Sequence, residues 1–326
     1  MSVKELIVRA LLREKSVSRA KLMEIVAGHT DTESIDVCIA ELIDKGYRIT
    51  RDSDTQLTLR DVPLKLYPEL VSSGLSGSLI GRKIIHYDQI ASTNDVALQL
   101  GRGGYPEGTV IVAEQQTQGR GRHARKWESR VGKSILCSIL FKPAKLHPNE
   151  TFYFTMLAGV SVVQALYDSL SLSCSIKWPN DVYLNTKKIC GILTEIGGEA
   201  KRVDYAVCGI GINVNQEQNE FSPDIPHAGS LVSILGMSID RLKLFKALLR
   251  RLDSNYDLFL RAEFDVIFSE WKHYCNSYGK KIRFEAGTRS GTGTILDITS
   301  TGALVVQCDG SGIVELNAGD IYLLEG

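Results

Sequence analysis

The sequence lacks any long apolar run, although 44% of its residues are hydrophobic. No stretch approaches the ~18 consecutive apolar residues of a membrane-spanning helix, and the start, Met1-Ser2-Val3-Lys4-Glu5, lacks the pattern of a signal peptide. The seven cysteines are scattered without a Cys-x-x-Cys pair, which argues for reduced thiols and against a disulfide framework or a zinc site. We therefore expect a cytoplasmic protein without a membrane partner.

The chain also lacks an excess of charge of either sign. Lys and Arg together number 38, as do Asp and Glu, so net charge gives no general attraction to nucleic acid. The six histidines have no metal-ligand spacing, and no Ser-His-Asp or Cys-His arrangement suggests a nucleophilic enzyme. With 326 residues, the chain is long enough for two or three domains.

The most informative segment is a basic loop with two glycines, Gly119-Arg120-Gly121-Arg122-His123-Ala124-Arg125-Lys126-Trp127. Glycine weakens helices and strands alike, and guanidinium groups bind carboxylate or phosphate oxygens in pairs. Such a loop could close over a phosphorylated or carboxylated small molecule. By itself it could equally be a solvated basic loop, since short motifs match by chance.

A second motif is Lys177-Trp178-Pro179-Asn180-Asp181-Val182-Tyr183-Leu184, and a predicted return strand over residues 188–195 follows it. The stretch Gly209-Ile210-Gly211-Ile212-Asn213 comes third. In this order the three motifs resemble those of biotin–protein ligases. With its N-terminal segment, the chain resembles the bifunctional ligases that also repress the biotin operon. The resemblance covers about residues 83–325 well and residues 1–62 more loosely.

We expect an α+β protein of three parts. Residues 1–62 would form a winged helix-turn-helix, residues 63–82 a linker, residues 83–277 the ligase domain and residues 278–326 a small β-barrel. For the ligase domain, strands over 83–87, 109–114, 134–141, 174–177, 181–184, 188–195 and 203–214 and helices over 93–100, 149–170 and 240–262 predict a mixed sheet. The resemblance implies a class II synthetase-like ligase domain and an SH3-like C-terminal domain.

The N-terminal pattern predicts three helices followed by a hairpin. The first covers residues 3–11, Ser18 caps the second, and Thr30 and Glu33 form a capping box for the third. The buried face of the third helix is expected to be Ile35, Ile39, Leu42 and Ile43. Residues 47–50 and 56–59 alternate like the two strands of a wing.

The charge of this module is unusual for a DNA-binding domain. Residues 1–62 contain ten Lys and Arg against eleven Asp and Glu, although phosphate contacts dominate protein–DNA affinity. A degenerate or purely interacting module is therefore the alternative to an operator-binding one. The candidate DNA contacts are Arg19 and Lys21 on the second helix and Arg48 and Arg51 on the wing.

The resemblance implies a two-step reaction. ATP and Mg²⁺ convert biotin into biotinyl-5'-AMP, and a lysine of a biotin carboxyl carrier protein of acetyl-CoA carboxylase then takes the biotinyl group. The implied catalytic residues are Lys177, which meets the biotin carboxylate and the α-phosphate, and Arg122, which helps to retain the adenylate. Asp181 is the expected Mg²⁺ ligand, because carboxylates supply hard oxygen ligands.

The remaining site residues follow from the same motifs. The expected biotin-binding residues are Ser92, Thr93, Asn94, Gln116, Arg120, Gly121, Arg122 and Lys177. The expected ATP- and adenylate-binding residues are Arg122, Trp127, Lys188, Gly209, Gly211 and Asn213. The hydroxyls and amide of residues 92–94 suit a ureido group, although the same residues could simply cap a helix.

Three other functions remain open. The chain could be a lipoate–protein ligase, a ligase with a vestigial helix-turn-helix, or a ligand-sensing transcription factor that has lost catalysis. The segment 177–181 favours biotin over lipoate, and the intact basic loop argues against lost catalysis. The expected partners are the carrier protein, operator DNA of a biotin operon and a second copy of the chain when the adenylate is bound.

Overall fold

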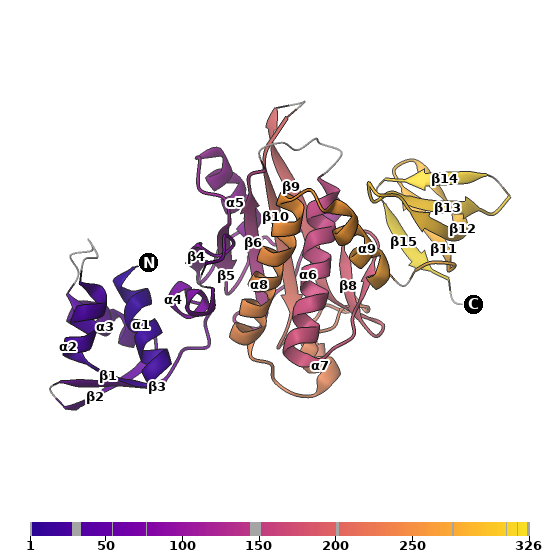
Figure 1. Ribbon diagram of the computed structural model, residues 1–326. Helices are drawn as coiled ribbons and strands as arrows, with labels where there is room; N and C mark the ends of the chain where they lie inside the picture. The colour runs from indigo at the N-terminus through magenta and orange to yellow at the C-terminus, as the bar shows by residue number, and fades with distance from the viewer. Residues whose placement is uncertain are drawn as a thin grey trace. The chain divides into compact units, whose positions relative to one another are not determined.

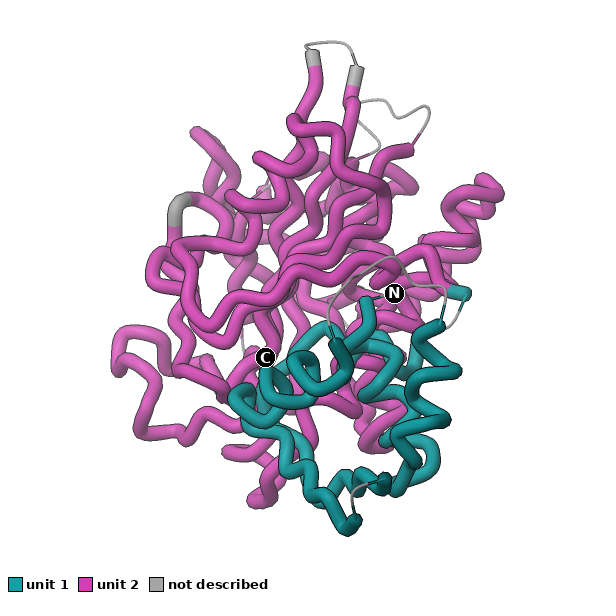
Figure 2. Tube along the Cα trace, turned by 90° about the vertical axis from the view of Figure 1, so that its left-hand side faces the viewer, with its two compact units in different colours: residues 1–77 teal, residues 78–326 magenta. Residues whose placement is uncertain are grey.

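The computed structural model describes residues 2–27, 34–53, 55–75, 77–143, 151–199, 202–275, 277–310, 312–317 and 319–324. Two compact units, residues 1–77 and 78–326, make up the chain (Figure 2). No helix within these described ranges is both long and apolar enough to cross a membrane. We propose that finer domain boundaries, at residues 62, 82 and 277, lie within these units.

Unit 1 consists of short helices and a three-stranded antiparallel sheet. Its elements are α1 (Val3–Glu14), β1 (Ser16–Ser18), α2 (Arg19–Val26), α3 (Ile35–Asp44), β2 (Arg48–Ser53), β3 (Gln56–Asp61), α4 (Pro68–Val71) and the 3₁₀ turn η1 (Ser72–Gly74). The strands are ordered β1-β3-β2. Strands β2 and β3 form the hairpin that the sequence pattern predicts.

Local sequence explains where the helices of unit 1 begin. The Ser18 hydroxyl accepts a hydrogen bond from Lys21 N at 3.2 Å, so the predicted cap of α2 is confirmed. The predicted capping box of Thr30 and Glu33 lies outside the described residues, and α3 begins after Ser34, which accepts from Val37 N at 3.3 Å.

One predicted core position in α3 is wrong. The buried residues of this helix are Ile35, Cys38, Ile39 and Leu42, which follow the i, i+3, i+4, i+7 spacing of one face. Ile43 was expected on that face but is 46% exposed. It comes one residue after the last buried position, so the rotation of 100° per residue carries it to the edge of the stripe.

Unit 2 holds a seven-stranded sheet with helices on both faces, followed by a five-stranded sheet (Figure 1). The elements of its larger part are β4 (Lys83–Tyr87), α5 (Thr93–Arg102), β5 (Thr109–Ala113), η2 (Arg122–Ala124), β6 (Ser134–Phe141), α6 (Phe152–Leu170), β7 (Ser175–Lys177), β8 (Asp181–Leu184), β9 (Lys187–Glu199), β10 (Arg202–Asn213), η4 (Gln218–Glu220), α7 (Leu231–Leu235), α8 (Arg241–Leu260) and α9 (Phe264–Tyr274). The expected mixed sheet is confirmed, while β1, α7 and α9 were not predicted.

The central sheet has the order β4-β5-β6-β10-β9-β8-β7, in which β4 and β5 are parallel and all other neighbours are antiparallel. Helix α6 covers one face, where Thr155 Oγ1 lies 2.8 Å from Thr194 Oγ1 of β9. Adjacent strand residues point to opposite faces. Gly209 therefore faces α5, and a Cβ there would come within 2.1 Å of Asn94 Oδ1.

The C-terminal strands are β11 (Lys281–Ala286), β12 (Arg289–Ile298), β13 (Leu304–Cys308), β14 (Ile313–Leu316) and β15 (Asp320–Leu323). They form an antiparallel sheet in the order β14-β13-β12-β11-β15, so the all-β character predicted for this segment is confirmed. Trp178 connects the two sheets of unit 2, because its buried indole Nε1 donates to Gly302 O at 2.8 Å. The C-terminal sheet thus packs beside the second sequence motif.

Candidate active site

A cavity of about 630 Å³ opens on the α5 face of the central sheet. Thirteen of the fourteen predicted ligand-binding and metal-binding residues line it: Ser92, Thr93, Asn94, Gln116, Arg120, Gly121, Arg122, Trp127, Asp181, Lys188, Gly209, Gly211 and Asn213. The fourteenth, Lys177, does not. Residues 121 sequence positions apart therefore converge on one concave site with several polar groups, an arrangement typical of binding sites for small molecules.

Glycines form the floor of this cavity beneath Trp127. Gly191 of β9 and Gly211 of β10 are cross-strand partners. A Cβ added at either position would lie within 2.8 or 2.6 Å of the Trp127 ring. The absence of side chains here is what lets the indole of the basic loop lie against the sheet, and the Lys188 Nζ sits 5.7 Å from the centre of that ring.

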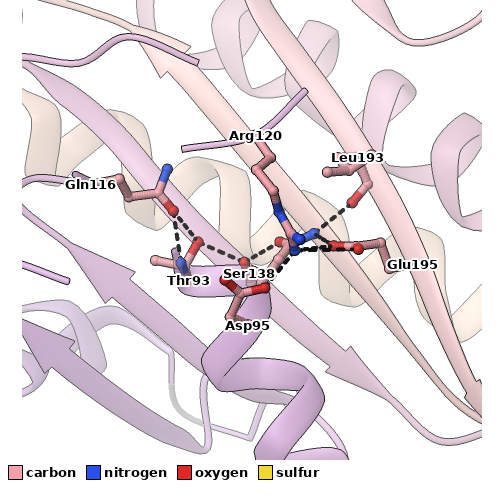
Figure 3. A network of polar contacts seen from close by, with 8 residues as sticks. Thr93, Asp95, Gln116, Arg120, Ser138, Leu193 and Glu195 are labelled. Atoms are coloured by element: carbon pink, nitrogen blue, oxygen red, sulfur yellow. Dashed lines mark hydrogen bonds and ion pairs between the residues drawn. The ribbon is translucent and has the colours of Figure 1, made fainter. Parts of the chain in front are cut away.

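One end of the cavity is a fixed network of hydroxyls and amides (Figure 3). Gln116 Oε1 accepts hydrogen bonds from Thr93 N at 2.7 Å and from Thr93 Oγ1 at 3.0 Å. Buried Ser138 places its Oγ 2.7 Å from Thr93 Oγ1 and 2.6 Å from Asn94 Oδ1. Ser92 precedes α5 without making a side-chain capping bond, so capping does not occupy its hydroxyl.

Carboxylates hold Arg120 at the edge of this network (Figure 3). Its Nη2 forms ion pairs with Asp95 of α5 and with Glu195 of β9, the latter at 3.4 Å. Glu195 Oε2 also accepts from Asn94 Nδ2 at 2.7 Å. Arg120 therefore anchors the basic loop to a helix and a strand, and part of its charge is compensated by the protein.

Arg122 is in a different electrostatic position. Its Nη1 contacts an amide, Asn180 Oδ1, at 3.4 Å, and it makes no direct ion pair among the described residues. Burial lowers the pKa of the guanidinium, while the charges of Asp320 and Asp181 oppose that shift. A partly buried cation that lacks a close counter-charge favours binding of an anion in the cavity.

The two candidate lysines differ in their surroundings. Lys188 lines the cavity, where its Nζ pairs with Asp181 Oδ1 at 2.7 Å. Lys177 instead places its Nζ over two tyrosine rings, 5.6 Å from the centre of Tyr183 and 6.0 Å from that of Tyr322. Burial lowers the pKa of Lys177, with Asp181 the strongest opposing charge. Lys188 thus lies in the cavity, and Lys177 lies at its border, beside Tyr322, which lines the cavity.

Two buried polar atoms at the cavity have neither a hydrogen-bond partner nor an ion-pair partner within the described part of the chain. They are the donor Trp127 Nε1 and the acceptor Asn213 Oδ1, although Asn213 Nδ2 donates to Gly229 O at 3.0 Å. Buried polar groups are nearly always paired in folded proteins. The orphan atoms therefore indicate where a ligand with both donors and acceptors would bind.

Sequence reasoning missed one wall of the cavity. It comes from the segment after β10 and includes Phe221, Ser222, Asp224, Ile225, Pro226, His227 and Ala228. The segment is tied to the end of the basic loop, because Glu220 O accepts from Arg130 Nη2 at 3.1 Å and Glu220 Oε2 pairs with Lys133 at 2.7 Å. Its length without a helical or strand period was the available signal, since long loops in compact domains are often functional.

The C-terminal sheet completes the cavity. Asp320 and Tyr322 of β15 line it, and Asp320 forms an ion pair with Arg125 of the basic loop. This pair raises the pKa of Arg125 against the opposing effect of burial. Both sheets of unit 2 therefore contribute to one site.

Comparison with known proteins shows the family of this chain. Residues 87–213 match the model of the Biotin/lipoate A/B protein ligase family, and residues 278–324 match that of the Biotin protein ligase C terminal domain. The protein named Bifunctional ligase/repressor BirA of Bacillus subtilis is 35% identical over 288 residues, which are 87% of this chain and 87% of that protein. The chain belongs to the biotin protein ligase family.

Two further relatives of the ligase are informative. The protein named Biotin--[acetyl-CoA-carboxylase] ligase of Mycobacterium tuberculosis is 28% identical, with 80% of this chain and 98% of that protein covered. The solved structure of the biotin protein ligase from Aquifex aeolicus in complex with biotin and ATP has a TM-score of 0.64 and 29% identity. It covers 75% of this chain and 100% of its own, so the ligase shares the fold of a protein seen with biotin and ATP bound.

Proposed function

We propose that the ligase forms biotinyl-5'-AMP from biotin and ATP in this cavity and passes the biotinyl group to a lysine of a biotin carboxyl carrier protein of acetyl-CoA carboxylase. One observation carries the proposal: the cavity joins a neutral polar network at Thr93, Asn94 and Gln116 to the cations Arg122 and Lys188. The network suits a ureido ring, and the cations suit a carboxylate and a phosphate. The relatives' names support the same reaction.

The first step brings two anions together. A biotin carboxylate oxygen attacks the α-phosphorus of ATP, the bond from that phosphorus to the β-phosphate oxygen breaks, and pyrophosphate leaves. Cations that are already in place lower the barrier, because they need not reorganise as charge develops. We assign the central positive charge to Lys177 together with Lys188, because Lys177 is the cross-strand partner of Asp181 on the cavity face and Lys188 pairs with the same carboxylate.

Arg122 would then bind phosphate oxygens and retain the adenylate. Trp127 would pack along the bound nucleotide, with Nε1 available to donate to it. In the second step the lysine amine of the carrier attacks the acyl carbon, the bond from that carbon to the phosphate oxygen breaks, and AMP leaves. The cover formed by the basic loop would keep water from this reactive anhydride.

Asp181 is our proposed contact for Mg²⁺. The described residues contain no group of three His, Cys, Asp or Glu side chains that could hold a metal. Mg²⁺ is commonly bound by one or two carboxylates together with substrate phosphates. The Asp181 carboxylate, which lines the cavity, therefore fits an ion that arrives with ATP, and the ion would supply charge neutralisation at the phosphates.

One assay separates biotin from lipoate as the substrate. The protein is incubated with ATP, Mg²⁺ and a carrier domain, with either biotin or lipoate, and the carrier is measured by intact mass. We expect one biotinyl addition and no lipoyl addition. A lipoyl product alone would identify a lipoate–protein ligase, and an unmodified carrier in both reactions would support the ligand-sensing alternative that has lost catalysis.

We also propose that unit 1 is a winged helix-turn-helix that binds operator DNA of a biotin operon. Helices α2 and α3 followed by the β2–β3 hairpin support this, as does the alignment with a relative named ligase/repressor. We further propose that the ligase is cytoplasmic and forms a homodimer when the adenylate is bound. We propose in addition that the C-terminal sheet of unit 2 is an SH3-like domain and that the part with the seven-stranded sheet is a class II synthetase-like domain.

The candidate DNA contacts are already engaged within unit 1. Arg19 and Arg51 both form ion pairs with Asp36 of α3, and Lys21 pairs with Glu14 at 2.7 Å. Arg48 is exposed on β2. DNA phosphates would have to replace Asp36, so we expect weak, salt-sensitive binding. A gel shift with a biotin-operon promoter, with and without biotin and ATP, tests it. No adenylate-dependent shift at low salt would leave a ligase with a vestigial module.

A further inference from the structure

Outside the cavity, a buried ion pair joins the two strands from which the basic loop emerges. Glu114 directly follows β5 and is 1% exposed; Arg241, the first residue of α8, is 5% exposed. Arg241 Nη2 lies 2.7 Å from Glu114 Oε2, and Arg241 Nη1 donates to Ser134 O at 2.9 Å. Ser134 begins β6. The Arg241 guanidinium thus connects Glu114, which precedes the segment 115–133 that contains the basic loop, with Ser134, which follows it.

Further contacts close the base of the loop around the same carboxylate. Gly132 N donates to Glu114 O at 3.0 Å, in a left-handed conformation with φ of 67°. His86 of β4 places its Nε2 3.4 Å from Glu114 Oε1. The Glu114 carboxylate therefore lies between the side chains of Arg241 and His86, and the Glu114 backbone oxygen binds Gly132 near the C-terminal end of the loop.

Stability alone is a poor explanation for this pair. Buried ion pairs lose much of their attraction to desolvation, and apolar replacements of similar volume are often neutral or stabilising. What apolar side chains cannot reproduce is the planar fork of arginine, which binds two acceptors in fixed directions. Here those acceptors belong to the two ends of one functional loop.

The loop is sensitive to how its ends are held. Gln116 follows Glu114 by two residues, and the loop then supplies Arg120, Arg122 and Trp127 to the cavity. A misplacement of about 1 Å in a reactive complex can reduce the rate by about 10²-fold. The orientation set at the base is therefore transmitted to groups that touch the substrates.

We propose that Arg241 and Glu114 are positioning residues that fix the base of the basic loop and thereby its ability to bind biotin and retain the adenylate. The proposal rests on the ligase function proposed above. Neither side chain is among the residues that line the cavity, so both act through the loop.

The test uses R241M, E114Q, the double variant and the conservative R241K in the full chain. The matched control is N255A, which removes a buried polar contact of the same helix: Asn255 Nδ2 donates to Ser161 Oγ of α6 at 2.8 Å. We would measure the KM for biotin and kcat in adenylate formation, release of free biotinyl-AMP, hydrogen exchange over residues 115–133, and thermal unfolding.

We expect R241M and E114Q each to raise the KM for biotin and adenylate release by about tenfold or more and to speed exchange over residues 115–133. The double variant should be no worse than the worse single variant, because both act through one contact. R241K should recover part of the loss, and should serve in place of R241M if that variant does not fold. N255A should reduce thermal stability without changing these three readouts.

The proposal is overturned if R241M and E114Q keep a wild-type KM, adenylate retention and loop exchange. It is equally overturned if their effects match those of N255A, which would reveal a purely structural role. Absence of biotin-dependent adenylate formation in the wild-type protein would instead contradict the proposed function, and loop exchange would still decide the role of Arg241.

Discussion

Replacing Lys188 with alanine should nearly stop adenylate formation while leaving the fold intact. The side chain lines the cavity and pairs with Asp181 at 2.7 Å. Its removal takes a positive charge from the place where a carboxylate and a phosphate must meet. It also leaves the Asp181 carboxylate without this cation, so a repulsive charge would face both anions.

The size of the effect follows from the charges. Two unit charges 4 Å apart attract by about 4 kcal/mol at the effective dielectric constant of a protein surface, and loss of one preorganised partner typically lowers kcat by about 10²–10³. Lys188 is 30% exposed, so solvent screens part of this attraction. We therefore expect a loss near the lower end, about 10²-fold. Lys177→Ala should likewise cost about 10²–10³-fold, because Lys177 faces Asp181 across the strand pair and supplies a second cation on the cavity face.

The assay is pyrophosphate release at saturating biotin and ATP, run on K188A, K188R and K177A beside the wild type. K188R should recover part of the activity because it restores the charge, and circular dichroism should show that all variants fold. The reasoning is refuted if a folded K188A stays close to wild type. That outcome, with K177A strongly impaired, would leave Lys177 as the central cation without Lys188.

Three further predictions follow from other contacts. Arg122→Gly should make the ligase leaky, so that free biotinyl-AMP labels lysines of a bystander protein; wild-type labelling, with the carrier still modified, would exclude Arg122 as the retaining residue. Hydrogen exchange over residues 116–130 should slow when biotin and ATP are added, because anions offset the repulsion among the loop cations; unchanged exchange would refute ordering. In unit 1, Asp36→Asn should release Arg19 and Arg51. DNA affinity should rise and its salt dependence steepen by about one to two in log–log slope; an operator-binding wild type with an unchanged variant would show that Asp36 does not mask them.

The sequence motifs supplied thirteen of the residues that line the cavity, because the motifs lie in the strands of the central sheet and in the loops that connect them. Gly209 and Gly211 are two residues apart in β10 and therefore lie on one face of the strand. Period-two reasoning alone thus predicts that both face the same side of the sheet. The basic loop could be predicted as irregular, since glycines interrupt its pattern.

The positions of the two lysines required the folded register. Asp181 is the cross-strand partner of Lys177 in β7 and also of Gly191 in β9, while a register shift follows Val182. Cross-strand partners lie on the same face of a sheet, so Lys177 shares the face of Asp181 and Gly191. Sequence spacing alone could not reveal this register, because a one-residue slip moves a side chain to the opposite face.

Contacts between distant elements were also beyond sequence reasoning. Arg241 reads as an ordinary charged residue at a helix start, yet it is buried against Glu114, 127 positions earlier in the chain. The same holds for Arg120, whose carboxylate partner Glu195 lies on a separate strand. Local patterns predict which elements form, but such partners are set by how the elements pack.

The central claim is that this cavity activates biotin with ATP, and exchange of radiolabelled pyrophosphate into ATP tests it most directly, because exchange requires reversible formation of the adenylate. The account predicts exchange that depends on biotin, that lipoate does not support, and that falls by about 10²-fold in K188A. Exchange without any dependence on biotin, or full exchange in K188A, would contradict it.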